Sequence, residues 1–267
     1  MNILVCVKQV PDTTEIKIDP VTKTLVRAGV PSIVNPFDAY ALEQAARIKD
    51  QVGGKITILT MGPPQAEAAI RSCLAVGGDV GYLVSGREFG GSDTLATSYI
   101  IFHAIRYLEK KNGVPFDLIF CGKQAIDGDT GQVGPELAEH LGYAQITYAS
   151  DVAIEDGAVV VTRDTDDGYD RMQASTPAVL TVTKTVHEPR MSNIRAKLAA
   201  TRAVIERITF ADLADIDADR IGLHGSPTKV KKTFTPEVRS NCLIIAENSA
   251  AQSAKKLVEL LSTAKIL

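Results

Sequence analysis

A run of glycine and short polar residues follows an apolar segment near the middle of the chain. Residues 122–134 read Gly-Lys-Gln-Ala-Ile-Asp-Gly-Asp-Thr-Gly-Gln-Val-Gly and lie between the apolar segment 116–121 and a helical pattern. Pro135 has no amide hydrogen and fits only the first turn of a helix, so we expect that helix to begin between residues 130 and 135. Its free amide groups would then face the glycine-rich loop. This arrangement favours a phosphate or pyrophosphate group.

The residue types in this loop suggest how it would bind a nucleotide. Three glycines would let the backbone approach a ligand closely: Gly128, Gly131 and Gly134. Lys123 would place a positive charge near a phosphate, and Asp127 or Asp129 would accept hydrogen bonds from ribose hydroxyls. The alternative is an ordinary glycine-rich connection, but this loop is longer than the usual ~2–6 residues. We therefore favour a nucleotide site.

Motifs spread over residues 4–190 resemble those of electron-transfer flavoprotein β subunits. The central matches are Gly-Lys-Gln-Ala-Ile-Asp at 122–127 and Thr-Gly-Gln at 130–132. The other matches keep the family's order: Leu-Val-Cys-Val-Lys-Gln-Val at 4–10, Asn-Pro-Phe-Asp at 35–38, Met-Gly-Pro at 61–63, Arg-Asp-Thr-Asp-Asp-Gly at 163–168, Thr-Pro-Ala-Val-Leu-Thr at 176–181 and Glu-Pro-Arg at 188–190. The family signature usually carries Glu or Gln where this chain has Asp170 and Arg171, so that portion is looser.

A second loop, at residues 86–93, precedes another helical pattern in which Ser92 or Asp93 can cap the helix. The residue types alone are equally consistent with a flexible glycine-rich loop that binds no ligand. Its Arg-x-Phe-x-Gly-x-Asp-Thr pattern is similar to that of bifurcating family members, whose β subunit holds FAD, whereas simpler members hold AMP. The resemblance implies contact with the isoalloxazine and with NADH for five residues: Arg87, Phe89, Asp93, Thr94 and Thr97.

The resemblance implies a function that needs partner proteins. The chain would be the β subunit of an electron-bifurcating flavoprotein, with FAD bound, in a heterodimer with an α subunit that holds a second FAD. The heterodimer would take electrons from NADH and split them between ferredoxin or flavodoxin and an acyl-CoA dehydrogenase. The alternative is a simple electron carrier in which this chain holds structural AMP. A remote alternative is an adenine-nucleotide hydrolase or ATP-sensing protein of the same fold, although no Walker-type Gly-Lys-Ser/Thr occurs.

No catalytic side chains are expected, because a flavin carries the chemistry itself. The residues expected to bind the cofactor are Cys6, Val7, Lys8, Asn35, Pro36, Phe37, Asp38, Tyr40, Met61, Gly62, Arg87, Phe89, Asp93, Thr94, Thr97, Cys121, Gly122, Lys123, Gln124, Asp127, Gly128, Asp129, Thr130, Gly131, Gln132, Val133 and Gly134. The family's recognition loop for dehydrogenases would follow residues 188–190. Here it is shorter and lacks a Leu-Pro pair, so docking in its familiar form is not expected.

Short apolar runs alternate with helical patterns along the first half of the chain. Strands are expected at 2–8, 55–60, 80–85 and 116–121, and helices at about 36–50, 64–76, 93–111 and 132–141. This order predicts an α/β fold with a doubly wound, mainly parallel, Rossmann-like sheet. Ligands bind such sheets at the carboxyl ends of the strands, where the strand order reverses. If the first and fourth strands flank that point, residues 6–10, 35–38 and 123–134 converge on one crevice.

The pattern changes after residue 145. Residues 154–162 predict two strands around an Asp-Gly turn, as part of a small antiparallel β extension. Residues 186–236 have weak periodicity and many charges, which suggests a partner-contacting arm. We therefore divide the chain into an α/β nucleotide-binding domain with its extension (1–185), the arm (186–236), and a C-terminal strand and helix (237–267) that pack on the same domain or on the partner subunit. The predicted strand is 242–246. The apolar stripe from Ala250 to Leu261 favours core packing over a partner face.

Composition excludes several classes of function. A net charge of -3, with no Trp and no basic stripe, argues against a nucleic-acid-binding protein. The four cysteines and four histidines lack metal-ligand spacing, so no metal and no disulfide framework are expected. The N-terminus reads as a strand rather than a signal peptide, and no run reaches the ~18 apolar residues of a membrane span. We expect a cytoplasmic protein.

Overall fold

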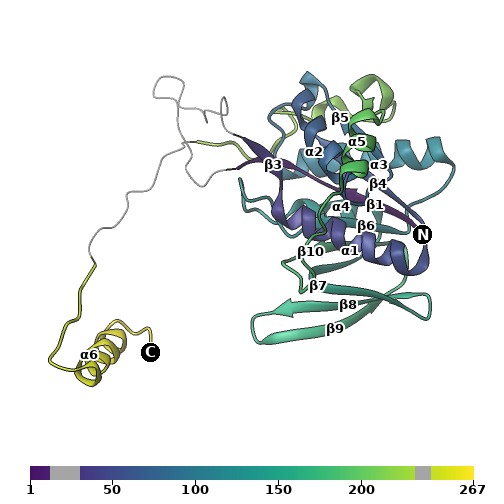
Figure 1. The fold of residues 1–267 in the computed structure, drawn as a ribbon. Coiled ribbons are helices and arrows are strands. Elements are labelled where there is room, and N and C mark those ends of the chain that lie inside the picture. The colour runs from purple at the N-terminus through teal and green to yellow at the C-terminus, as the bar shows by residue number, and fades with distance from the viewer. Residues whose placement is uncertain (13–30, 232–241) are drawn as a thin grey trace. The chain divides into compact units, whose positions relative to one another are not determined.

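The computed structural model describes residues 1–12, 31–231 and 242–267. The chain divides into two compact units, one formed by residues 1–15 and 27–231 and the other by residues 16–26 and 232–267. The first unit contains a nine-stranded sheet with the order β11-β5-β4-β1-β6-β10-β7-β8-β9 and a two-stranded antiparallel sheet, β2-β3 (Figure 1).

The helices and strands of the first unit alternate as the sequence predicts. The strands are β1 (Asn2–Cys6), β2 (Gln9–Pro11), β3 (Ser32–Val34), β4 (Lys55–Met61), β5 (Val80–Val84), β6 (Leu118–Gly122), β7 (Ala144–Glu155), β8 (Ala158–Thr165), β9 (Gly168–Ala174), β10 (Ala178–Val182) and β11 (Glu206–Ile208). The α-helices are α1 (Pro36–Val52), α2 (Glu67–Leu74), α3 (Thr94–Asn112), α4 (Val133–Leu141) and α5 (Ile194–Arg202). Short 3-10 turns are η1 (Pro64–Ala66), η2 (Arg87–Phe89), η3 (Phe210–Asp212) and η4 (Ala218–Arg220).

The order of the first four main strands confirms a doubly wound fold. In chain order the parallel strands β1, β4, β5 and β6 are the first, second, third and fourth, and they lie in the sheet as third, second, first, fourth. β1 pairs with β4 on one side and with β6 on the other, so the chain changes direction across the sheet at β1. The predicted switch point between the first and fourth strands is therefore confirmed.

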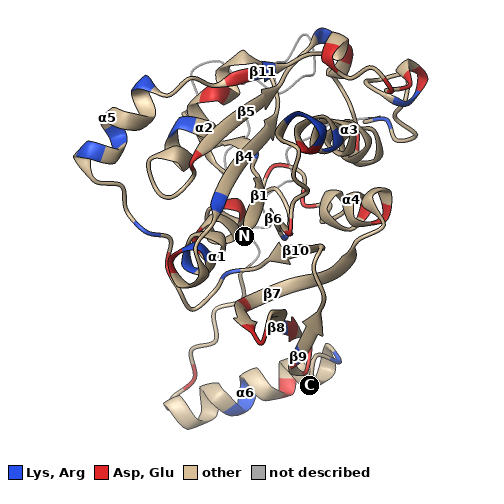
Figure 2. Ribbon diagram, turned by 90° about the vertical axis from the view of Figure 1, so that its right-hand side faces the viewer, with Lys and Arg blue, Asp and Glu red and all other residues tan. Residues whose placement is uncertain are grey.

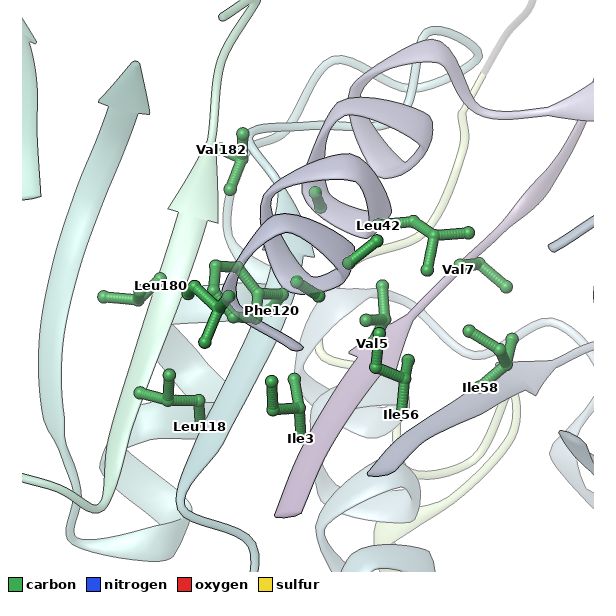
Figure 3. Packing of buried hydrophobic residues seen from close by; sticks show 14 of the residues in the cluster. Ile3, Val5, Val7, Leu42, Ile56, Ile58, Leu118, Phe120, Leu180 and Val182 are labelled. Carbon is green, nitrogen blue, oxygen red and sulfur yellow. The ribbon is translucent and has the colours of Figure 1, made fainter. Parts of the chain in front are cut away.

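Two apolar layers cover the sheet. On one face, α1 and α2 pack on side chains of β1, β4, β6 and β10, and Figure 3 shows Leu42 of α1 near Val5 and Val7, with Phe120 and Leu180 on the other side of the same helix. On the other face, α3 and α4 pack on alternate residues of the same strands. Burying one Leu or Phe side chain stabilises the fold by roughly 1.5–3 kcal/mol, so these layers hold the strand ends in fixed positions.

The antiparallel extension is continuous with the main sheet. β7 pairs parallel with β10, and then β7, β8 and β9 form an antiparallel meander. The predicted Asp-Gly turn joins β7 to β8, with φ of 49° at Asp156 and 79° at Gly157. Positive φ at both central residues is the geometry that Asp-Gly favours in a two-residue hairpin. The hairpin prediction is therefore confirmed.

Residues 186–231 differ from the predicted arm. The strand β11 pairs parallel with β5 and extends the main sheet by one strand. Ile208, Leu213 and Ile221 are buried in the core on the α3 face. The sequence pattern did not predict that this segment joins the core, because only three short pieces of it do so and its periodicity is weak. The arm's last residues, from 232 to 236, lie outside the described part of the chain.

The described residues of the second unit contain the helix α6 (Ala250–Thr263), which confirms the predicted helical stripe. Ser249 caps this helix by accepting a hydrogen bond from the Gln252 amide at 3.3 Å. None of its residues is buried, so core packing of the stripe is not observed. The strand predicted at 242–246 was wrong, because these residues join no strand and Ile244 is 85% exposed. Residues 237–241 lie outside the described residues.

Candidate functional site

The carboxyl ends of β1 and β6 meet the start of α1 at one buried carboxylate. Asp38 Oδ2 accepts a hydrogen bond from Lys8 N at 2.7 Å, and Asp38 Oδ1 accepts from Gly122 N at 3.1 Å. Asn35 Nδ2 also donates to Asp38 Oδ1, at 2.9 Å. Two segments that are far apart in sequence, at residues 8 and 122, are thus fixed to the first turn of α1. The predicted segments therefore adjoin at these residues, while a ligand crevice between them stays a prediction.

Burial sets the charge of this carboxylate. Asp38 is 6% exposed, and burial raises its pKa to about 7, while hydrogen bonds from Asn35, Lys8 and Gly122 oppose the rise. The group is therefore half-protonated near neutral pH. A cofactor contact through Asp38 is hard to reconcile with this burial, and the side chain acts as a clamp between the three segments.

Asn35 holds the loop rather than capping the helix. It occupies the cap position of α1, but its side chain makes no cap hydrogen bond. Instead, Nδ2 donates to the Gln124 carbonyl at 2.9 Å, and Oδ1 accepts from Ile126 N at 3.2 Å. Together with its bond to Asp38, these contacts use both amide hydrogens and the carbonyl oxygen. The loop at 122–134 is therefore anchored at its first turn by a side chain that is 1% exposed.

The loop also contains its own polar pairs. Lys8 Nζ lies 2.6 Å from Asp127 Oδ1, and Gln124 Nε2 donates to Asp129 Oδ1 at 2.7 Å. The backbone turns sharply at Asp129 and Gly131, where φ is 52° and 64°. The two acidic groups predicted to accept from ribose are thus engaged within the protein, and a ligand would have to share or replace these contacts.

The three loop glycines have different roles. A Cβ at Gly128 would meet nothing within 4 Å, so the backbone there is open to a ligand. A Cβ at Gly134 would lie 2.4 Å from Thr181 Cγ2, so this glycine lets α4 approach β10 and does not face a ligand. The expectation that all three glycines admit a ligand is corrected at Gly134. α4 itself begins at Val133, within the predicted interval.

Lys123 lies between two aromatic rings. Its Nζ is 5.7 Å from the centre of the Phe37 ring and 5.4 Å from that of the Tyr148 ring, which are cation–π distances. Tyr148 has φ of 59°, a conformation that costs a non-glycine residue about 1–3 kcal/mol. Tyr148 was not predicted, because no pattern of residue types indicates a tyrosine whose backbone is in the left-handed conformation. Lys123 presents its charge at this rim of the sheet.

The predicted loop at residues 86–93 lies beside the loop at residues 122–134. Thr94 Oγ1 is 3.0 Å from Gln132 Oε1 and 3.3 Å from Glu136 Oε1, so the starts of α3 and α4 touch. Burial raises the pKa of Glu136, although hydrogen bonds from Ser98 and Thr94 lower it. Glu136 was not predicted. Its acidic side chain directly after Pro135, in the first turn of the helix, is the sequence signal that could have indicated it.

The residues predicted at the loop at 86–93 differ in how accessible their side chains are to a ligand. Arg87 is exposed, whereas the Phe89 ring is 3% exposed and packs in the core. Asp93 caps α3 by accepting from Ala96 N at 3.1 Å. Burial acts to raise the pKa of Asp93, but hydrogen bonds from Ala96 and Thr228 hold it below its usual range. Of these three side chains, Arg87 is the one free to meet a ligand.

The remaining predicted residues line the same strand ends or lie away from them. Cys6 and Cys121 lie side by side on β1 and β6, and the Cys6 thiol together with burial raises the pKa of Cys121, so it stays a thiol. Met61 is the last residue of β4 and Gly62 follows it, and Val7 is buried. Tyr40 points instead to Glu188, with Oη 2.9 Å from Oε2. Four others lie on the loops or helix starts already described: Pro36, Thr97, Thr130 and Val133.

A cavity of about 360 Å³ lies beside the start of α3 and not at the loop at 122–134. It is lined by Leu95, Tyr99, Asp219, Arg220, His224, Gly225, Ser226 and Pro227. Arg220 covers the ring of Tyr99 at 3.9 Å from its centre. We place the candidate site at the strand ends instead, because there the amides of α4, two loops and the cation of Lys123 meet at the switch point. Among the described residues, no cluster of side chains has the composition of a metal site.

Comparison with known proteins agrees with this geometry. Residues 22–213 match the family model described as the electron transfer flavoprotein domain. The chain is 52% identical over 247 residues to an electron transfer flavoprotein subunit beta of Megasphaera elsdenii, covering 92% of this chain and 91% of that protein. It is 46% identical to the subunit beta of Thermoanaerobacterium thermosaccharolyticum over the full length of both. It is also 42% identical to the caffeyl-CoA reductase-Etf complex subunit CarD of Acetobacterium woodii, again over both full lengths.

Proposed function

The chain belongs to the electron transfer flavoprotein family as a β subunit, and we propose that it is of the electron-bifurcating type and binds FAD. In a heterodimer with an α subunit that holds a second FAD, it would take electrons from NADH. One electron would pass to ferredoxin or flavodoxin and the other to an acyl-CoA dehydrogenase. All four cysteines are free thiols, which fits the expected reducing cytoplasm.

The contact between Thr94 and Gln132 is the observation that carries this proposal. It brings the start of α3, directly after the loop at 86–93, against the loop at 122–134, so the site has two adjoining parts. AMP would need the loop at 122–134 alone, because adenosine and one phosphate fill a single helix-start site. A dinucleotide as long as FAD has a further ring system to place. The loop at 86–93, with the exposed cation of Arg87, would receive that ring system.

The chain's own residues would bind and orient the flavin. The amides at the start of α4 and the backbone at Gly128 would hold the pyrophosphate, and Lys123 would add a positive charge. Thr94 and Arg87 would meet the ring system. A bound flavin supplies hydride acceptance and single-electron transfer, which is why no acid–base pair is needed. Lys8 and Asp127 keep the loop ordered around the ligand.

Two surfaces suit the proposed partners. Figure 2 shows Lys and Arg along α5, whose first residue, Ile194, is 80% exposed, while Met191 before it is 96% exposed. A basic surface with exposed apolar side chains fits a docked protein such as the acyl-CoA dehydrogenase. The relative from Acetobacterium woodii is itself named as part of a complex with a CoA-ester reductase. The exposed apolar stripe of α6 fits the α subunit, as does the preceding extended segment with Ile244.

AMP in place of FAD is the second candidate, and a specific observation favours it. Phe89 is buried and the carboxylate of Asp93 is occupied by Ala96 and Thr228, so two residues of the implied flavin set are not free. With AMP, the chain would be a structural nucleotide holder in a simple electron carrier.

Reduction of ferredoxin by NADH tests the proposal. The purified heterodimer would be mixed with NADH, ferredoxin and an acyl-CoA dehydrogenase with its enoyl-CoA substrate. Bifurcation predicts that ferredoxin is reduced only when the enoyl-CoA is present, in step with NADH oxidation. Oxidation of NADH with no ferredoxin reduction under any condition would contradict the bifurcating type and favour the AMP-holding carrier.

A further inference from the structure

Residues 222–228, named here the latch segment, lie against the loop at residues 86–93. Gly222 N donates a hydrogen bond to Ser92 Oγ at 3.0 Å. Ser92 Oγ in turn donates to the carbonyl of Phe89 at 2.8 Å. The latch segment therefore reaches the interior of the loop through one serine.

Two glycines let the segment and the loop approach at backbone distance. Gly222 has φ of 60°, and a Cβ there would lie 2.4 Å from the carbonyl oxygen of Glu88. Gly91 has φ of 76°, and a Cβ there would lie 2.6 Å from the side chain of Leu223. Only residues without a Cβ fit at both positions. The contact is thus built into the backbones of both segments.

Asp93 joins the latch segment to the start of α3. One carboxylate oxygen accepts from Ala96 N at 3.1 Å and so caps the helix. The other accepts from Thr228 N at 3.0 Å and from Thr228 Oγ1 at 2.8 Å. The amide of Asp93 donates to Ser226 Oγ at 2.9 Å. One residue therefore anchors the helix start and the latch segment together.

We propose that Thr228 and Ser226 are positioning residues, which hold the loop at 86–93, with Arg87, and the start of α3, with Thr94, in the arrangement that receives the flavin ring. This inference rests on the proposed function. Asp93 then acts through the loop and need not touch the flavin, which explains why both of its oxygens are occupied. A loop held in place before binding loses less conformational freedom when the ligand arrives. Removing the Thr228 hydroxyl should therefore weaken flavin binding without removing a ligand contact.

The test compares three substitutions in the full heterodimer. Thr228→Val removes the hydroxyl and keeps the volume, while Thr228→Ser keeps the hydroxyl. The matched control is Thr209→Val, because Thr209 Oγ1 donates to Asp212 Oδ2 at 2.6 Å in a similar Thr–Asp pair outside the loop. Three quantities would be measured for each: FAD retained per heterodimer on dilution, the visible circular dichroism of the bound flavin, and amide exchange of residues 86–97.

Thr228→Val should weaken FAD retention on this chain roughly tenfold, as expected for a lost hydrogen bond to a charged group. It should also change the flavin dichroism and speed amide exchange in the loop. Thr228→Ser and Thr209→Val should match the wild type. If Thr228→Val retains FAD and dichroism like the wild type, the positioning role is overturned and the proposed function still stands. If the wild type itself carries no FAD on this chain, the proposed function fails, and the positioning role fails with it.

If Thr228→Val does not fold, Ser226→Ala replaces it, because it removes the bond to Asp93 N and leaves a smaller change in shape. A loss of flavin retention confined to Ser226→Ala, with thermal stability equal to that of Thr209→Val, would support positioning. Unchanged retention and exchange would contradict it.

Discussion

Asp38 gives the site a pH-dependent element at the scale of one residue. Its pKa is raised from 3.8 to about 7 by burial. Because the folded form holds the proton more tightly, its contribution to stability is fully present below pH 3.8 and is lost as pH rises through 7. We predict that the free energy of unfolding falls over this interval by up to about 4 kcal/mol from this group.

Urea unfolding of the wild type and of Asp38→Asn between pH 4.5 and 8 measures that slope. The substitution should lower stability at acidic pH, because an amide group would face the Lys8 amide, and it should flatten the pH dependence. Asp79→Asn is the matched control, since Asp79 also accepts a backbone hydrogen bond, from Ile56 N at 2.7 Å. A variant Asp38→Asn that keeps the full wild-type slope would show that another group titrates.

Individual residue roles were predicted less well than residue locations. The helix predicted at about 36–50 does begin at Pro36, and yet the side chain of Asn35, directly before it, binds the loop and makes no cap hydrogen bond. A cap and a loop anchor need the same residue type at the same position. Only the fold around it decides which hydrogen bond forms. Phe89 is a similar case, because an aromatic residue in a loop can equally well face a ligand or fill the core.

At the scale of elements, the glycine-rich loop depends on Asn35. We predict that Asn35→Ala weakens adenine-nucleotide binding roughly tenfold, because the carbonyl of Gln124 and the amide of Ile126 lose their partner. Isothermal titration with AMP or FAD measures this. Asn193→Ala is the control, since Asn193 caps α5 through the Ala196 amide away from the loop. Equal nucleotide affinity in both variants would show that Asn35 does not contribute to binding.

Adding a methyl group at Gly134, at the end of the loop, and at Gly128, in its middle, should have different effects. Gly134→Ala would press on Thr181 at the junction of α4 and β10 and should destabilise the fold by about 1–3 kcal/mol. Gly128→Ala has open space and should leave thermal stability unchanged, while reducing nucleotide affinity if the ligand lies against this backbone. Thermal unfolding and titration of the two variants separate these effects. Loss of stability in Gly128→Ala would contradict the open geometry.

Elements with strong alternation or periodicity were predicted within a few residues, and the short ones were not. β11 joins the sheet through three residues, which is too short a run to show a pattern. The apolar residues 242–246 looked like a strand, although a strand forms only where an edge is available to pair with it. Such pairing is a property of the whole fold and cannot be read from five residues.

At the scale of the whole molecule, the sequence order of strands and helices was enough to predict the doubly wound topology. The right-handed crossovers of parallel sheets leave few alternatives once the alternation is known. The position of the candidate site followed from the topology, because the strand order reverses at β1 and β6. What could not be predicted is the network of side chains around the two loops, including Tyr148, Glu136 and Thr228.

The second unit should be needed for assembly and not for the fold of the first. We predict that a chain ending after Lys231 keeps the thermal unfolding midpoint of the nucleotide-binding unit, because α6 buries none of its residues. Its association with the α subunit should weaken at least tenfold, as measured by analytical ultracentrifugation. An unchanged association would show that α6 has no role in the heterodimer. A substitution of Leu257 by Lys in the full chain is the milder version of the same test.

The nucleotide content of the heterodimer tests the central claim most directly. The two subunits would be purified together, the nucleotides released by acid, and FAD and AMP counted per heterodimer by chromatography. We predict two FAD and no AMP. One FAD and one AMP would contradict the bifurcating assignment, and a chain that binds no nucleotide under any reconstitution would contradict the site at residues 122–134 itself.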